Sequence, residues 1–72
     1  MKRVYKLQNL GCANCAAKIE NDIAQLAGVN SVRVNFMTQK LILDADQEVF
    51  ASILEQAQTI AHKYEPDLLI IN

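Results

Sequence analysis

Residues 11–20 (GCANCAAKIE) join a predicted strand to a predicted helix, and this junction decides the fold. Residues 3–9 come before it and carry strand-forming side chains, so they predict a strand that ends at Gly11. From Cys15 onward, apolar residues recur at the spacing of an amphipathic helix, at Ala16, Ile19, Ile23 and Leu26. Gly28 stands where a glycine commonly ends a helix. The cysteine segment is therefore expected to be a loop between a strand and a helix.

Two paired strands are predicted after this helix. Residues 32–36 alternate apolar and polar side chains, as a half-buried strand does. Residues 37–39 predict a hairpin turn, and Leu41 and Leu43 continue the alternation into a third strand.

A second helix and a last strand complete the pattern. Asp44 and Asp46 open the helix, with Asp46 as the expected N-cap, and Pro66 ends it because proline lacks the helical N–H. Its apolar stripe consists of Val49, Phe50, Ile53, Leu54, Ala57, Ile60 and Ala61. Residues 68–71 predict a short apolar strand. The order βαββαβ over residues 1–72 predicts a single α+β domain. It is a ferredoxin-like sandwich, with two helices on one face of a four-stranded antiparallel sheet.

This topology also predicts where the loops lie. Successive elements run in opposite directions, so the connection after the first strand, the hairpin and the connection after the second helix share one end of the molecule. Cys12, Cys15, residues 37–39 and residues 62–66 should therefore meet at that end.

Composition excludes several classes of protein. The 72 residues are 51% hydrophobic and 21% charged. The balance of 7 basic against 8 acidic residues offers no electrostatic footprint for nucleic acid, which usually needs a clustered basic face. The longest apolar runs are far below the roughly 18 residues that cross a membrane. The N-terminus does not resemble a signal peptide, so we expect a monomeric cytoplasmic domain in which thiols stay reduced.

The only two cysteines, Cys12 and Cys15, are separated by two residues, which lets both sulfurs point at one ion. Cys15 is expected at the start of the helix, where unpaired N–H groups should favour its thiolate. Thiolates select soft ions such as Cu(I), Zn(II), Cd(II), Pb(II) or Hg(II). Two cysteines and one histidine cannot fill a closed four-ligand zinc site, so an open site remains.

Residues 9–20 resemble the cysteine signature of heavy-metal-associated domains. Residues 28–29, 34–36 and 64–67 also have counterparts in that family. Such domains occur as copper chaperones, as mercury-binding proteins and as N-terminal modules of heavy-metal P-type ATPases. The Cys-Ala-Asn-Cys-Ala and Tyr-Glu-Pro-Asp segments look most like the Zn/Cd-exporting subgroup.

Three residues depart from the family pattern. Asn9 and Leu10 replace the usual glycine and methionine, and Leu10 is expected to fill the apolar pocket under the metal loop. Gly11 stands where some Zn/Cd members have an aspartate ligand. A third ligand would have to come from elsewhere. The loop argument offers Glu65, His62 and Met37, and the resemblance gives Tyr64 a packing role.

The resemblance implies a metal-binding domain and not an enzyme. It would hold Zn(II) or Cd(II), or Pb(II), through Cys12 and Cys15 and serve as the regulatory or delivery domain of a metal-efflux ATPase in the cell membrane. Its partners would be the membrane and catalytic domains of that ATPase or a metal carrier. Because two sulfurs alone suit linear Cu(I), a Cu(I) chaperone or copper-ATPase domain is one alternative. A dithiol oxidoreductase is the other.

Overall fold

The computed structural model describes residues 1–71. The elements in chain order are β1 (Lys2–Gln8), α1 (Ala13–Ala24), β2 (Val29–Asn35), β3 (Lys40–Ala45), the 3-10 turn η1 (Gln47–Val49), α2 (Phe50–Tyr64) and β4 (Leu69–Ile71). This order confirms the predicted βαββαβ pattern.

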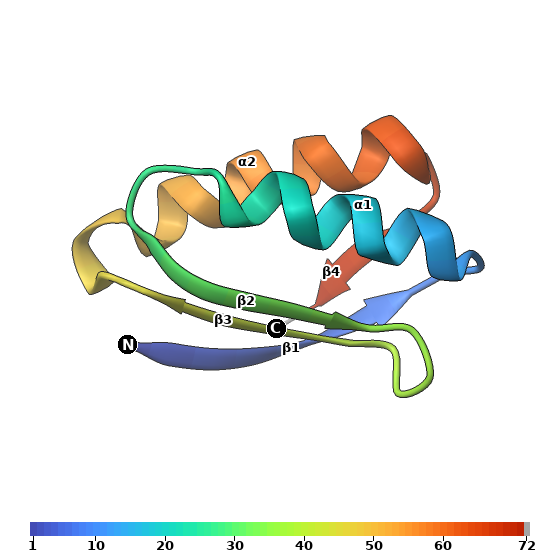
Figure 1. Cartoon of the computed structure of the whole chain (residues 1–72), viewed down its shortest axis with the longest axis horizontal. Helices are drawn as coiled ribbons and strands as arrows, with labels where there is room; N and C mark the ends of the chain where they lie inside the picture. Colours follow the sequence, from blue (N-terminus) through green and yellow to red (C-terminus); the bar gives the residue numbers. More distant parts are fainter. Residues whose placement is uncertain (72) are drawn as a thin grey trace.

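The four strands form one antiparallel sheet in the order β2-β3-β1-β4. Both helices pack on the same side of this sheet (Figure 1). The predicted ferredoxin-like sandwich is therefore confirmed.

The core lies between the sheet and the helices. On β1 only Tyr5 and Leu7 are buried, so their side chains face the helices while alternate residues face away. The most deeply buried large side chains, all at most 1% exposed, are Ile19, Ile23, Leu41, Leu43, Ile53 and Leu68. They come from both helices, from β3 and from the segment before β4, so one contiguous core fixes all the elements.

Both helices begin differently from the prediction. α1 starts at Ala13 with Cys12 as its N-cap, so the cysteine segment is the first helical turn and not a loop. The reason is local, because the Cys15 N–H donates to the Cys12 sulfur at 3.2 Å. Asp46 precedes η1 without a side-chain capping bond, and α2 begins only at Phe50.

Residues with positive φ lie in the turns before β2 and β3. Gly28 is not the residue that ends α1, because the C-cap is Gln25. Gly28 instead lies in the turn before β2 with a φ of 91°, and a Cβ there would approach Val49 Cγ2 to 2.7 Å. The predicted hairpin between β2 and β3 is present, and Gln39 closes it with a φ of 55°.

Candidate metal centre

The two cysteines are free thiols at the N-terminal end of α1. Cys12 is the N-cap and Cys15 lies in the first turn, and both side chains are partly buried. A helix start gives both sulfurs a fixed position, because the N–H groups of the first turn have no intrahelical partner and one of them binds Cys12.

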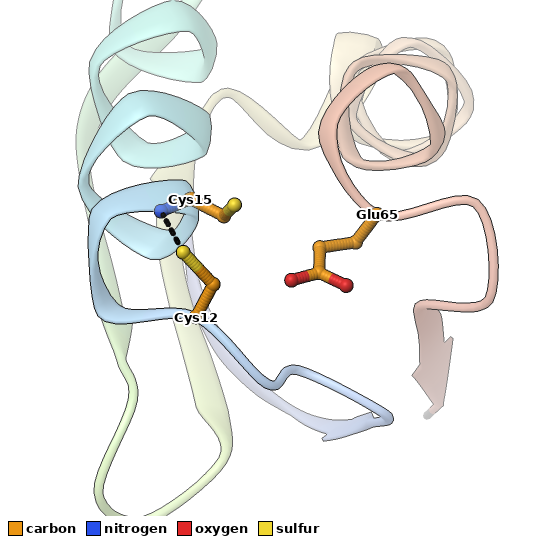
Figure 2. A group of neighbouring side chains, drawn as sticks. All are labelled: Cys12, Cys15 and Glu65. Carbon is orange, nitrogen blue, oxygen red and sulfur yellow. Dashed lines mark hydrogen bonds between the residues drawn. The ribbon is translucent and has the colours of Figure 1, made fainter.

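Glu65 brings a carboxylate to the same place from the other helix. It is the C-cap of α2, with its N–H bonded to the Ala61 carbonyl. One carboxylate oxygen and the sulfurs of Cys12 and Cys15 all lie within 4.8 Å of one another. Figure 2 shows the carboxylate of Glu65 pointing toward the two sulfurs across the gap between the helix ends. The predicted meeting of these loops at one end is confirmed.

The other two proposed ligands, His62 and Met37, do not join the group of Cys12, Cys15 and Glu65. The His62 Nε2 atom is 3.0 Å from the Leu68 carbonyl oxygen and 2.9 Å from the Gln58 amide nitrogen, so its ring is engaged beside β4. Met37 is 85% exposed at the tip of the hairpin.

The pKa values of the two thiols shift in opposite directions. Hydrogen bonding from the Cys15 side chain and backbone N–H lowers the pKa of the Cys12 thiol below its usual 9.0. Hydrogen bonding to Cys12, burial, and the negative charges of Cys12 and Glu65 raise the pKa of Cys15 to about 11. The helix start was expected to favour the Cys15 thiolate, but its N–H bond goes to the Cys12 sulfur, and the pKa of Cys15 is raised. The residue that caps the helix gains the N–H donor, and its neighbour then keeps a proton.

Gln39 anchors the start of the cysteine segment. Its side chain accepts from the Leu10 N–H at 3.2 Å and donates to the Leu10 carbonyl at 2.7 Å and to the Phe36 carbonyl at 2.9 Å. Leu10 itself is 4% exposed, which confirms that it fills the apolar pocket under the loop. The role of Gln39 could not be predicted from the sequence, because a hairpin glutamine carries no local signal of a bond made 29 residues away.

Two further hydrogen bonds join the segment around the cysteines and α1 to the segment around Glu65. The Asn9 amide donates to the Asp67 carbonyl at 2.9 Å, and the Tyr64 hydroxyl donates to the Asp22 carboxylate at 2.6 Å. The bond to Asp22 raises the pKa of Tyr64 above its usual range. Tyr64 also packs against the core, as expected, but no sequence pattern indicated its partner in α1.

A βαββαβ sandwich with two thiols and a carboxylate at one end defines a class of small metal-binding domains. Residues 4–65 match the model of the heavy-metal-associated domain, and the chain belongs to this family.

Its relatives in sequence include much longer proteins. It is 49% identical over 49 residues to a zinc/cadmium/lead-transporting P-type ATPase of Escherichia coli K12, covering 68% of this chain and 7% of the relative. It is 48% identical over 40 residues to a probable cadmium-transporting ATPase of Staphylococcus aureus MRSA252, covering 56% of this chain and 6% of the relative. The chain thus spans under a tenth of the length of these proteins. Across residues 1–71, no helix is both long and apolar enough to cross a membrane.

Solved structures of similar length also match this chain over almost its whole length. The apo N-terminal domain of ZntA is 38% identical, with a TM-score of 0.66, and the match covers 99% of this chain and 92% of that one. The CopZ metallochaperone has a TM-score of 0.74 at 15% identity over 99% of this chain and all of that one, which shows the shared fold alone.

Proposed function

We propose that this domain binds one Zn(II), Cd(II) or Pb(II) ion through the sulfurs of Cys12 and Cys15 and the carboxylate of Glu65. We also propose that it receives or delivers the ion as a non-catalytic, cytoplasmic, monomeric domain of a longer P-type ATPase. The observation that carries the proposal is the approach of these three ligand atoms to within 4.8 Å of one another.

The donor set favours a divalent ion over Cu(I). Two thiolates alone satisfy a linear monovalent ion, whereas a carboxylate oxygen is a harder donor that suits Zn(II) and its heavier relatives. Two thiolates and one carboxylate carry three negative charges. They leave one net negative charge around a divalent ion and two around Cu(I), so the divalent complex is less charged at this partly exposed site.

The names of the similar transporters also favour a divalent ion. The transporters that resemble this chain in sequence are named for zinc, cadmium and lead. Bacillus subtilis CopA, at 22% identity, shares the fold only, and the N-terminal domain of the copper(I) ATPase PacS is 27% identical, below the 38% of the ZntA domain. The copper alternative is therefore not favoured.

The same geometry suits transfer of the ion. Three protein donors leave coordination positions open, and the site lies at the end of the molecule where a partner can approach. An incoming thiolate or carboxylate can bind the ion before a donor of this domain leaves, so the ion need not be free in water. Glu65 follows α2, whereas the cysteines lie at the start of α1, so the carboxylate and the sulfurs can leave the ion one after the other.

Metal titrations of the reduced chain test the donor set. Glu65→Gln should weaken Cd(II) and Zn(II) binding by about tenfold or more and leave Cu(I) binding within about twofold. Glu55→Gln is the matched control, because Glu55 is an exposed residue of the same helix, and it should change neither affinity.

Other outcomes would contradict the proposal. Equal Cd(II) affinity in the two glutamine variants would remove Glu65 from the site. A preference for Cu(I), with no Cd–thiolate absorbance at one equivalent of Cd(II), would favour the copper alternative. Turnover of a disulfide substrate by the Cys12 and Cys15 pair would favour the oxidoreductase.

A further inference from the structure

The side of the sheet opposite the helices is uncovered by any described element (Figure 1). Residues paired across neighbouring strands point to the same side, so the register defines this face. Tyr5 pairs with Leu41, and both are buried under the helices. The neighbouring pairs Val4–Ile42 and Lys6–Lys40 therefore lie on the open face.

Exposed and half-buried apolar side chains occur at two places on this face, at the Val4–Ile42 pair of β1 and β3 and on the edge strand β4. Val4 is 55% exposed and pairs with the half-buried Ile42. On β4, Leu69 is 45% exposed and Ile71, opposite Lys6, is half-buried. Single exposed apolar residues are ordinary, but here four share one flat surface of three adjacent strands.

Positive charge lies beside and between these apolar residues. The register places Arg33 opposite Ile42 and Lys6 opposite Ile71, and Lys2 lies two residues before Val4 on β1. Four of the seven basic residues lie on the same face, namely Lys2, Lys6, Arg33 and Lys40. Asp44 is its one carboxylate among residues 1–71, and that group lies 3.4 Å from the N-terminal ammonium. The other three basic and seven acidic residues lie elsewhere in the chain, so the net charge of −1 hides a strongly polarised molecule.

One cross-strand pair, Lys6 and Lys40, destabilises the sheet that it belongs to. Lys6 and Lys40 are directly opposite each other on β1 and β3, and like charges in that position destabilise a sheet. An opposite charge at either position would stabilise the pairing. The chain instead concentrates positive charge at this point, beside Ile71 and the Val4–Ile42 pair.

We propose that the open sheet face binds an acidic, amphipathic segment of a protein partner. Its apolar residues would cover Val4, Ile42, Leu69 and Ile71, and its carboxylates would pair with the adjacent lysines and Arg33. Protein–protein interfaces commonly combine buried apolar contacts with charged groups that pair across the interface. The positive charge of this face selects an acidic partner over a basic one.

Other occupants fit this face less well. Single-stranded nucleic acid and membrane interfaces both use exposed aromatic side chains. The four aromatic residues of this chain are all buried in or packed against the core: Tyr5, Phe36, Phe50 and Tyr64. A second copy placed face to face would bring two sets of four cations together.

This proposal does not rest on the proposed metal site. The sheet face and the group of Cys12, Cys15 and Glu65 share no residue, so each can fail without the other.

The test uses the apo, reduced chain and a labelled synthetic helical peptide of about 15 residues with leucines on one side and glutamates on the other. Binding is followed by fluorescence anisotropy and by amide chemical shifts. We expect shifts confined to the open-face residues of β1, β3 and β4, and affinity that falls as salt rises. The same peptide with lysines in place of glutamates should not bind.

Two variants with the same change in net charge distinguish an effect of the open face from an effect of the overall charge. Lys6→Glu should weaken peptide binding at least about tenfold while leaving the melting temperature unchanged or higher, because it replaces a repulsive pair with Lys40 by an attractive one. Lys18→Glu, on the exposed side of α1, should leave peptide binding within about twofold.

Several results would overturn the proposal. Equal losses in the two variants would show that only net charge matters, and shifts at the helices would place the peptide on another surface. No peptide binding, combined with concentration-dependent association of the chain, would assign the face to a second copy. No peptide binding, combined with binding to phosphatidylglycerol vesicles that Lys6→Glu abolishes, would assign it to a lipid surface.

Discussion

The hydroxyl of Tyr64 donates a 2.6 Å hydrogen bond to the carboxylate of Asp22, which lies 42 residues earlier in the chain. Tyr64 is the last residue of α2 and precedes Glu65, whereas Asp22 belongs to the helix that begins beside the cysteines. This bond therefore couples the positions of the carboxylate and of the two sulfurs.

Removing that hydroxyl should weaken metal binding without touching a ligand. Tyr64→Phe keeps the ring against the core but frees Glu65 to move, so we expect Cd(II) affinity to fall about tenfold, as when an outer-shell bond is lost. Asp22→Asn should have a similar effect. In a double-mutant cycle measured by chelator competition, the two changes together should cost little more than one, and full additivity would show that the bond plays no part.

The two cysteines should react in a fixed order. Cys12 has the lowered pKa and Cys15 a pKa of about 11, so iodoacetamide should label Cys12 first near neutral pH. Peptide mapping by mass spectrometry of the apo chain measures this order. In Cys12→Ser, the hydrogen bond to the Cys12 sulfur and its negative charge are both absent, so the pKa of Cys15 should move toward 9.0 and its labelling should speed up. Faster labelling of Cys15 than of Cys12 in the unchanged chain would contradict the assignment.

Metal affinity should depend on pH in two stages. Binding needs both sulfurs as thiolates, so it displaces two protons below the pKa of Cys12 and only the Cys15 proton above it, up to about pH 11. The logarithm of Cd(II) affinity should therefore rise with a slope near two in acid and near one at higher pH. Chelator competition between about pH 5 and pH 9 measures the slope. A plateau within that range would mean that Cys15 is already ionised.

Gln39 should matter for both stability and binding. Gln39→Ala leaves the partly buried N–H and carbonyl of Leu10 without partners, which should lower the free energy of unfolding by about 2 kcal/mol. Urea unfolding measures the change. Gln56→Ala removes a glutamine that is exposed on α2 and bonds only within its own helix, and it should change stability by less than about 0.5 kcal/mol. Similar losses in both variants would deny Gln39 its anchoring role.

The fold could be predicted because its signals are local and periodic. Alternation in residues 32–36 and the helical stripe from Phe50 to Ala61 give the correct elements. The topology then brings Glu65 to the cysteines without any contact being known. The starts of the helices could not be predicted as well, because they depend on which side chain caps a particular N–H, as Cys12 does and Asp46 does not.

The candidate ligand residues could be predicted from the sequence, but the hydrogen bonds that position them could not. The spacing of Cys12 and Cys15 is a local signal, whereas the bonds of Gln39 and Tyr64 join residues far apart in sequence. The expected effect of the helix start on Cys15 is not seen for a related reason. The helix start favours an anion in general, but only the geometry of Cys12 decides which sulfur benefits.

The position of Glu65 at the far end of α2 gives the metal a second effect. An ion held by all three donors would cross-link segments about 50 residues apart, and clips that close long loops restrict the unfolded chain most. Binding of the ion would then slow backbone hydrogen exchange where the two helix ends meet, and release of the ion would speed this exchange. A partner that takes the ion would thus leave behind a domain more prone to local opening than the one it met.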